Sequence, residues 1–249
     1  MFESYKEIFN KRGTLYNSAM IDCPYARKNE FNYIIELAEI SEGNLIIDIP
    51  SGGGYLINYI KPSVNVISVE TSNLFVQDIQ PKTNQSILLC NDISNTLFPV
   101  GCADRVISLA GLHHIEERLN FYSEIYRMVK PGGLFCIGDA YKNSSVASFL
   151  NIFVNQFNSM GHNGIFLSNE DVFLLKKVGF NIISQKIYGY TWDFTDADAM
   201  AGYCQKLFGM NMADIKTIQS GIQSFVGYKL DQHSCKMNWE LFFIKAHKS

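Results

Sequence analysis

The stretch NLIIDIPSGGGYL, Asn44 to Leu56, joins a short apolar run, an acidic residue and a glycine cluster. An apolar run without alternation is typical of a strand buried on both faces of a parallel sheet. The glycines permit positive φ and let a ligand approach the backbone closely. We therefore expect a strand, a tight turn and a helix from about Tyr55, whose free N–H groups and dipole would favour a carboxylate, phosphate or ribose. The alternative is a turn that only joins a strand to a helix.

Length and composition indicate a globular protein with a substantial core. The chain has 249 residues, of which 47% are hydrophobic, and a net charge of −3 without a block of Lys or Arg. This charge favours a small molecule as partner and disfavours nucleic acid. There is no apolar run long enough for a signal peptide or a membrane span, so we expect a cytoplasmic protein without membrane contact. The six cysteines lack a C-x-x-C pair and are expected to be reduced, and no metal site is predicted.

Apolar periodicity then predicts an N-terminal helical cap, residues 1–43. It consists of helices over Glu3–Lys11 and Arg27–Ile40, separated by an irregular segment that contains Tyr16. After the glycine turn, strand patterns recur at intervals long enough for crossover helices: 64–69, 86–90, 105–110 and 134–138. The clearest helix, 116–129, ends at the sequence KPGG. Alternating strands and helices predict a doubly wound α/β fold with helices on both faces of the sheet.

The second half of the chain, 141–249, carries further elements. A helix is predicted over 145–157, then a loop with the sequence GHNG, then a helix capped by Ser168. In the strand from Asn181, aromatic residues at 188, 190, 192 and 194 share one face. A cap at Thr195 begins a helical insertion, about 194–232, before the last strand, 236–246. Without a linker or repeat, we expect one domain over 1–249, with the core at 44–140.

Three acidic residues follow the ends of successive strands. Asp48 precedes the glycines, Glu70 ends the second strand and Asp92 follows the third. In an open parallel sheet, ligands lie at the carboxyl ends of the strands, where an acid can accept hydrogen bonds from ribose hydroxyls. A nicotinamide-dependent dehydrogenase is disfavoured, because the turn lacks the last glycine or alanine of G-x-G-x-x-G.

From Asn44 to about Asp139 the chain resembles a class I S-adenosylmethionine-dependent methyltransferase. The segments that carry the resemblance are IDIPSGGGYL, VISVE, CNDI, RVISLAGLHHIEE and MVKPGGLFCIGDA, in this order. The resemblance implies a mostly parallel seven-stranded sheet whose last strand is antiparallel. It also implies S-adenosyl-L-methionine as the cofactor and S-adenosyl-L-homocysteine as the product.

Carried over by position, the resemblance implies a set of cofactor-binding residues. Gly52 and Gly54 would bracket the methionine moiety, and Glu70 would hold the ribose hydroxyls. Asp48 would support the loop near the sulfonium. The remaining expected contacts are with Pro50, Asp92, Ile93 and Leu109. Pro50 stands where the family commonly has its first glycine, and a proline stiffens the turn or removes an N–H contact.

The sequence gives weaker signals for the acceptor site than for the cofactor site. His113 and His114 follow the fourth strand and are the predicted catalytic bases, although both could equally shape the loop. Tyr16, His162, Tyr190 and Trp192 are the predicted substrate-binding residues. The insertion at 194–232 is expected to cover the acceptor, its alternative being an extra helical layer or a dimer surface. The aromatic residues at its root favour an apolar or aromatic small molecule.

These observations predict a methyltransferase that acts on a small molecule, most simply at oxygen or nitrogen, by direct displacement. Two alternatives stay open: a cofactor-binding protein of the same fold without methyl transfer, and an enzyme that uses the cofactor in another reaction such as a cyclisation. A homodimer also stays open. Neither the acceptor nor the methylated atom follows from the sequence.

Overall fold

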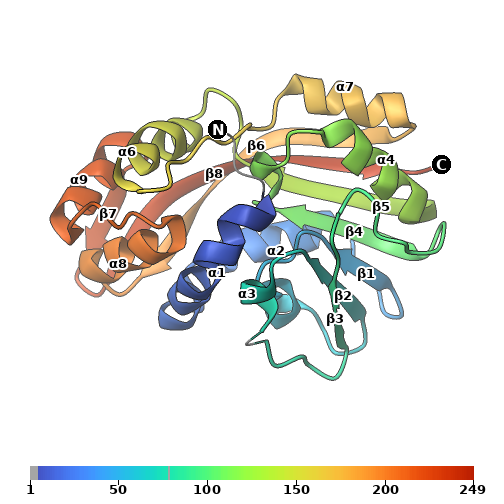
Figure 1. The fold of residues 1–249 in the computed structure, drawn as a ribbon, viewed down its shortest axis with the longest axis horizontal. Coiled ribbons are helices and arrows are strands. Elements are labelled where there is room, and N and C mark those ends of the chain that lie inside the picture. Colours follow the sequence, from blue (N-terminus) through green and yellow to red (C-terminus); the bar gives the residue numbers. More distant parts are fainter. Residues whose placement is uncertain (1–4, 78) are drawn as a thin grey trace.

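The computed structural model describes residues 5–77 and 79–249, so Glu3, the predicted start of the first helix, lies outside the described residues. The described part contains one mixed sheet with the order β3-β2-β1-β4-β5-β8-β6, and β7 pairs with β8 (Figure 1). The strands are β1 Leu45–Asp48, β2 Asn65–Glu70, β3 Gln85–Leu89, β4 Ala103–Leu109, β5 Val129–Asp139, β6 Asn181–Phe194, β7 Tyr228–Asp231 and β8 Ser234–His247.

Strand directions confirm the predicted doubly wound sheet. Strands β1 to β5 pair in parallel, and β8 runs antiparallel to both β5 and β6. The order changes direction between β1 and β4, which places the switch point beside the glycine turn. Among the described residues, the sheet has one strand more than the seven predicted. This extra strand is β7, whose four residues YKLD are too short a run to signal a strand. It forms a hairpin with the start of β8.

Alternation along the strands divides the core into two layers. Ile46 packs with the layer of α2 (Lys28–Leu37), α8 (Ala197–Phe208) and α9 (Ile215–Phe225), whereas Ile47 packs with that of α4 (Arg118–Met128) and α7 (Asn169–Val178). Neighbouring residues of a strand point to opposite faces, so both faces of the sheet are covered. A helical stretch follows β5 and includes a π-helical part; it is formed by α5 Ser145–Ser148, η3 Phe149–Val154 and α6 Asn155–Phe157.

Helix α1, Tyr5–Asp22, is one continuous helix where an irregular segment was predicted after Lys11. The prediction was wrong because Gly13 was taken for a helix breaker. Gly13 instead allows close packing, since a Cβ there would lie 3.0 Å from the Cβ of Leu74. Helix α1 therefore lies between α8 and α3 (Asn73–Val76), as Figure 1 shows.

Three further local predictions can be compared with the structure. The glycine turn leads into a short 3₁₀ helix, η1 Tyr55–Tyr59, in place of the expected α-helix. Helix α8 is capped by Asp196, whose carboxylate accepts from Ala199 N, and not by Thr195. The predicted cap at Ser168 is confirmed, with a full capping box that includes Asp171.

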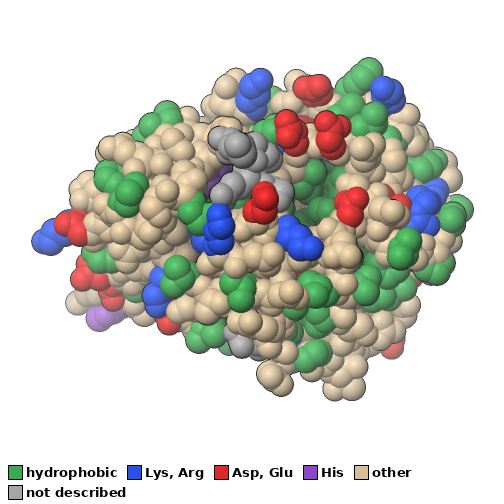
Figure 2. Space-filling view, in the orientation of Figure 1, with side chains coloured by type: hydrophobic (Ala, Val, Ile, Leu, Met, Phe, Trp, Pro, Cys, Tyr) green, Lys and Arg blue, Asp and Glu red, His purple; other side chains and the backbone are tan. Residues whose placement is uncertain are grey.

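None of the described helices combines the length and the apolar character needed to cross a membrane. On the face shown in Figure 2, Lys and Arg side chains are interspersed with Asp and Glu, without a broad area of one sign. The described residues therefore present no extended basic surface on this face.

Candidate active site

The glycine turn joins β1 to η1 at the carboxyl edge of the sheet. Gly52 and Gly54 have positive φ, 55° and 69°, so both positions favour glycine. Pro50 packs against a second glycine: a Cβ on Gly111 would lie 2.7 Å from the Cγ of Pro50. The proline that replaces the family's usual first glycine is thus accommodated by a missing side chain on the opposite loop, after β4.

Glu70 ends β2 beside this turn, and both oxygens of its carboxylate are hydrogen-bonded. Oε1 accepts from the backbone N–H groups of Thr71 and Ser72, at 2.7 and 2.9 Å. Oε2 accepts from Gly52 N and from the Tyr5 hydroxyl, both at 2.8 Å. Burial raises the pKa of Glu70, and these hydrogen bonds act in the opposite direction. Both oxygens of Glu70, the residue predicted to bind the ribose, thus have partners within the protein, and Oε2 connects the glycine turn to helix α1.

A narrow cavity of about 40 Å³ lies over the turn. Four residues predicted to bind the cofactor line this cavity: Asp48, Pro50, Gly52 and Leu109. Tyr16, predicted to bind the acceptor, lines it as well. Burial, and then the charge of Glu70, raise the pKa of Asp48 well above its ordinary value. Asp92 and Ile93 follow β3 and do not line this cavity; Asp92 is exposed and accepts from Ser94 N.

A second cavity, of about 60 Å³, adjoins the first. We call it the chamber. The two share Phe9, Tyr16, Arg27 and Ala110 as wall residues. The chamber brings together most of the residues predicted for catalysis and acceptor binding, namely Tyr16, His113, His114, His162 and Trp192.

Tyr190 does not belong to the chamber. It lines a separate groove with Thr191, Asn238 and Glu240, so its prediction as an acceptor-binding residue finds no support in the structure. Trp192, two residues further along β6, reaches the chamber and donates from Nε1 to Glu30 Oε2 at 2.9 Å. Sharing one face of a strand is therefore not enough to reach one cavity.

The three histidines lie against one another in the chamber wall. His113 bonds through Nδ1 to Asp139 Oδ1 at 2.7 Å, and its backbone N donates to Asp139 Oδ2 at 3.0 Å. Burial alone would raise the pKa of Asp139, but the charge and hydrogen bonds of His113 lower it. An ionised Asp139 accepts from Nδ1, so Nδ1 carries a proton and Nε2 is the nitrogen that can exchange a proton with a ligand.

His114 and His162 differ from His113 in their surroundings. Burial first, and then the nearby His113, lower the pKa of both well below its ordinary value. His162 is also fixed by its Nδ1, 3.0 Å from Asn151 Oδ1. Both imidazoles are therefore neutral near pH 7.

A metal is one ligand such a cluster could bind. Ring nitrogens of the three histidines lie within 4.8 Å of one another, whereas three nitrogens on one tetrahedral zinc ion would be about 3.4 Å apart. Arg12 lines the same chamber and its charge lowers the pKa of His114 and His162. That positive charge opposes a dication, so we assign no metal to the cluster.

Several chamber residues were not predicted from the sequence. These are Arg12, Arg27, Phe208 and Trp239. For Arg12 a signal existed: in a continuous helix it falls on the same face as Tyr5, Phe9 and Tyr16, which places a cation within an aromatic stripe. The irregular segment assumed for this region hid that spacing.

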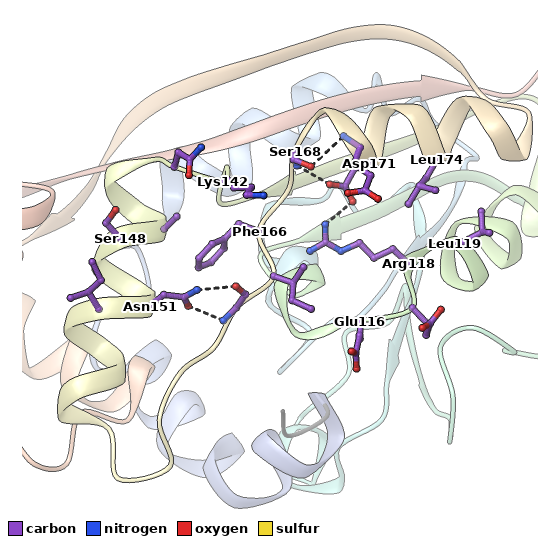
Figure 3. Close-up of a pocket in the computed structure, with 17 residues that line it drawn as sticks. Glu116, Arg118, Leu119, Lys142, Ser148, Asn151, Phe166, Ser168, Asp171 and Leu174 are labelled. Atoms are coloured by element: carbon purple, nitrogen blue, oxygen red, sulfur yellow. Dashed lines mark hydrogen bonds and ion pairs between the residues drawn. The ribbon is translucent and has the colours of Figure 1, made fainter. Parts of the chain in front are cut away.

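A wider groove, of about 630 Å³, lies outside the chamber. Arg118 pairs with Asp171 at 2.6 Å, and the Asn151 side chain bonds to the backbone of Gly164. Figure 3 shows the side chains of Arg118, Asp171 and Asn151 around this groove. Asn151 also holds His162, so the segment around Gly164 separates this groove from the chamber. Because its arginine is paired and the glycine turn does not line it, the groove is not the candidate active site.

Comparison with known proteins agrees with this geometry. The sheet order and the cavity at its switch point are those of a Rossmann-like fold. Residues 47–137 match the family model described as a methyltransferase domain. This part of the chain is therefore similar to a methyltransferase domain.

Individual relatives act in different ways. The chain is 30% identical over 118 residues to erythromycin 3''-O-methyltransferase of Saccharopolyspora erythraea, covering 43% of this chain and 38% of that protein. Phosphoethanolamine N-methyltransferase 2 of Haemonchus contortus, in complex with phosphomonomethylethanolamine and S-adenosylhomocysteine, has a TM-score of 0.67 at 16% identity, over 99% of this chain and 60% of that one. The [4+2]-cyclase SpnF has a TM-score of 0.67 at 13% identity, over 98% and 94%.

The curated matches are confined to part of each protein. The chain spans between 31% and 38% of the lengths of the curated relatives that it matches. At identities of 13% and 16%, the likeness to these solved structures concerns the fold alone.

Proposed function

We propose that this chain transfers a methyl group from S-adenosylmethionine to a small-molecule acceptor, at oxygen or nitrogen. The observation that carries the proposal is the shared wall of Phe9, Tyr16, Arg27 and Ala110 between the cavity over the glycine turn and the histidine chamber. A donor in one cavity and an acceptor in the other would meet at this wall. Such alignment is the main contribution that a methyltransferase needs to make.

The residues around the turn fit the cofactor. At Gly52, a Cβ would meet only the Phe75 ring, at 3.9 Å, so the backbone is open to a close ligand. Glu70 would hold the ribose hydroxyls, and Gly52 and Gly54 the methionine moiety. When bound, the cofactor supplies a methyl group on a sulfonium, which is a good leaving group.

The chamber residues would handle the acceptor proton. With Nδ1–H held by Asp139, His113 offers Nε2 to the acceptor hydroxyl or amine. Nε2 would accept that proton during methyl transfer, for which the bound cofactor would supply the methyl group and then leave as a neutral thioether. Asp139 positions the imidazole and stabilises its charged form, as a carboxylate does in other base–carboxylate pairs. His114 and His162 exclude water around the transfer.

Two measurements test the proposal. Calorimetry with S-adenosylhomocysteine should show saturable binding, and a radiolabelled methyl donor should label members of a panel of hydroxyl and amine compounds. Saturable binding without any labelling would favour a cofactor-binding protein or another reaction. His113→Ala should lower turnover while leaving S-adenosylhomocysteine affinity unchanged; an unchanged rate would leave His113 a structural residue.

A further inference from the structure

Arg12 is a buried cation that forms no ion pair with the described residues. Its side chain lines the chamber and the residue is 8% exposed. Nη2 donates to the carbonyl of Leu207 at 2.8 Å, and Nε finds no partner among the described residues. The guanidinium fits beneath the end of α8 because Gly209 has no side chain there: a Cβ would lie 2.6 Å from Nε.

Other buried arginines of the described chain are neutralised, which sets Arg12 apart. Arg27 pairs with Glu30, and Arg118 with Asp171. Burial lowers the pKa of Arg12 to about 10, with no carboxylate to raise it, so the side chain stays charged near pH 7. Unpaired buried charge is costly and is commonly balanced by an ion or a ligand.

The acidic side chains near the chamber are already engaged. Asp139 bonds to His113 and to Ala140 N, and Glu30 bonds to Arg27 and Trp192. Neither forms an ion pair with Arg12 among the described residues. The carboxylates of Asp139 and Glu30 are thus committed to other partners, and an anionic ligand would supply the charge that balances Arg12.

Part of the chamber wall is formed by stacked aromatic rings. Trp192 and Trp239 stack with ring centroids 4.3 Å apart and planes 26° apart. Phe208 stacks on both tryptophans, with planes 16° and 20° away from theirs. Such a wall is suited to the face or edge of another ring.

We propose that the chamber binds a planar aromatic carboxylate, whose acid group pairs with Arg12 and whose ring packs against Trp192 and Trp239. This inference rests on the proposed function, since it names the acceptor class: a ring acid that also carries a hydroxyl or amine to meet His113. Bidentate pairing with carboxylate is the geometry that guanidinium favours.

The chain offers its own reporter of chamber occupancy. It contains two tryptophans, and both stand in the chamber wall. Quenching of intrinsic fluorescence by 3-hydroxybenzoate, with saturating S-adenosylhomocysteine, would therefore report binding without turnover. The neutral isostere 3-hydroxybenzamide serves as the matched ligand.

We expect 3-hydroxybenzoate to bind at least tenfold more tightly than the amide, and Arg12→Met to abolish this preference. Arg12→Lys should restore part of it. Lys11→Met removes a charge from the exposed side of the same helix and should leave the preference intact. Arg12→Met should also melt no lower than the unliganded native protein, because it removes an unbalanced charge.

Several results would overturn the inference: no quenching of the native protein by hydroxybenzoates, an acid preference that survives Arg12→Met, or an Arg12→Met variant that loses S-adenosylhomocysteine affinity instead. The last result would assign Arg12 to the carboxylate of the cofactor. Acid binding through Arg12 without methyl transfer would uphold this subsite and contradict the proposed function. Methyl transfer to neutral phenols without any preference for acids would uphold the proposed function and contradict this subsite.

Discussion

At the scale of single residues, Glu70 connects the glycine turn to the first helix. Its carboxylate closes the glycine turn through Gly52 N and accepts the Tyr5 hydroxyl from α1. The sequence predicted the position of this acid at the end of the second strand. It could not predict the contact with Tyr5, because 65 residues separate the two and only the packing of α1 brings them together.

Replacing Glu70 by Gln tests its proposed role in holding the ribose. A neutral amide loses the charge-assisted hydrogen bonds, so S-adenosylhomocysteine should bind more weakly by roughly 1.5–3 kcal/mol. Calorimetry measures the change. Glu124→Gln makes the same substitution at a buried acid that bonds to Thr96 and Arg127, away from the site, and should leave the affinity unaltered. Equal affinities for native protein and Glu70→Gln would contradict the assignment.

At the scale of elements, strong apolar periodicity predicted strands and helices correctly, whereas a single glycine misplaced the end of the first helix. The strand at Leu45–Asp48 and the helix at Arg118–Met128 were predicted, because buried strands and amphipathic helices have clear patterns. Helix α1 was predicted to end too early, since the close packing of Gly13 on Leu74 has no local signature. Of the chamber residues, Tyr16, the three histidines and Trp192 were predicted; Trp239, on β8, joins the chamber through pairing of distant strands.

Helix α1 provides the second prediction, at Tyr5. Burial and the charge of Glu70 raise the pKa of Tyr5, so its hydroxyl remains a donor to that carboxylate. If the ribose hydroxyls use the same oxygen, Tyr5→Phe removes a competitor and should tighten S-adenosylhomocysteine binding by about 0.5–1.5 kcal/mol. Tyr25→Phe, at a 73% exposed position, is the control. Weaker binding in Tyr5→Phe would show instead that the hydroxyl contacts the cofactor.

At the scale of the whole molecule, two buried histidines link stability to pH. Because His114 and His162 have pKa values well below 6.5 in the folded chain, they bind protons more readily when it unfolds. Their contribution to stability is therefore fully present above the unfolded pKa of about 6.5 and is lost as the pH falls below it. The steepest loss expected is about 1.4 kcal/mol per pH unit for each group.

Thermal unfolding between pH 7.5 and 5.5 checks this expectation. The native protein should lose more stability over this range than His162→Gln, because glutamine does not titrate. The lost bond to Asn151 is independent of pH and cancels in the comparison. His233→Gln, at an exposed position on the β7–β8 hairpin, should retain the full slope. Parallel pH profiles for the native protein and His162→Gln would refute the linkage.

Because α1 is continuous and lines both cavities, it bears on how a ligand in one cavity affects a ligand in the other. Tyr5 touches Glu70 at one end of the helix, and Arg12, two turns later, stands in the chamber. A helix that moves as one body cannot release Glu70 without shifting the guanidinium. If a ligand in either cavity moves α1, occupation of the two cavities would be coupled, and thermodynamic reciprocity would then require each ligand to alter the affinity of the other by the same factor. Helix α1 would thus couple the binding of the donor to the binding of the acceptor.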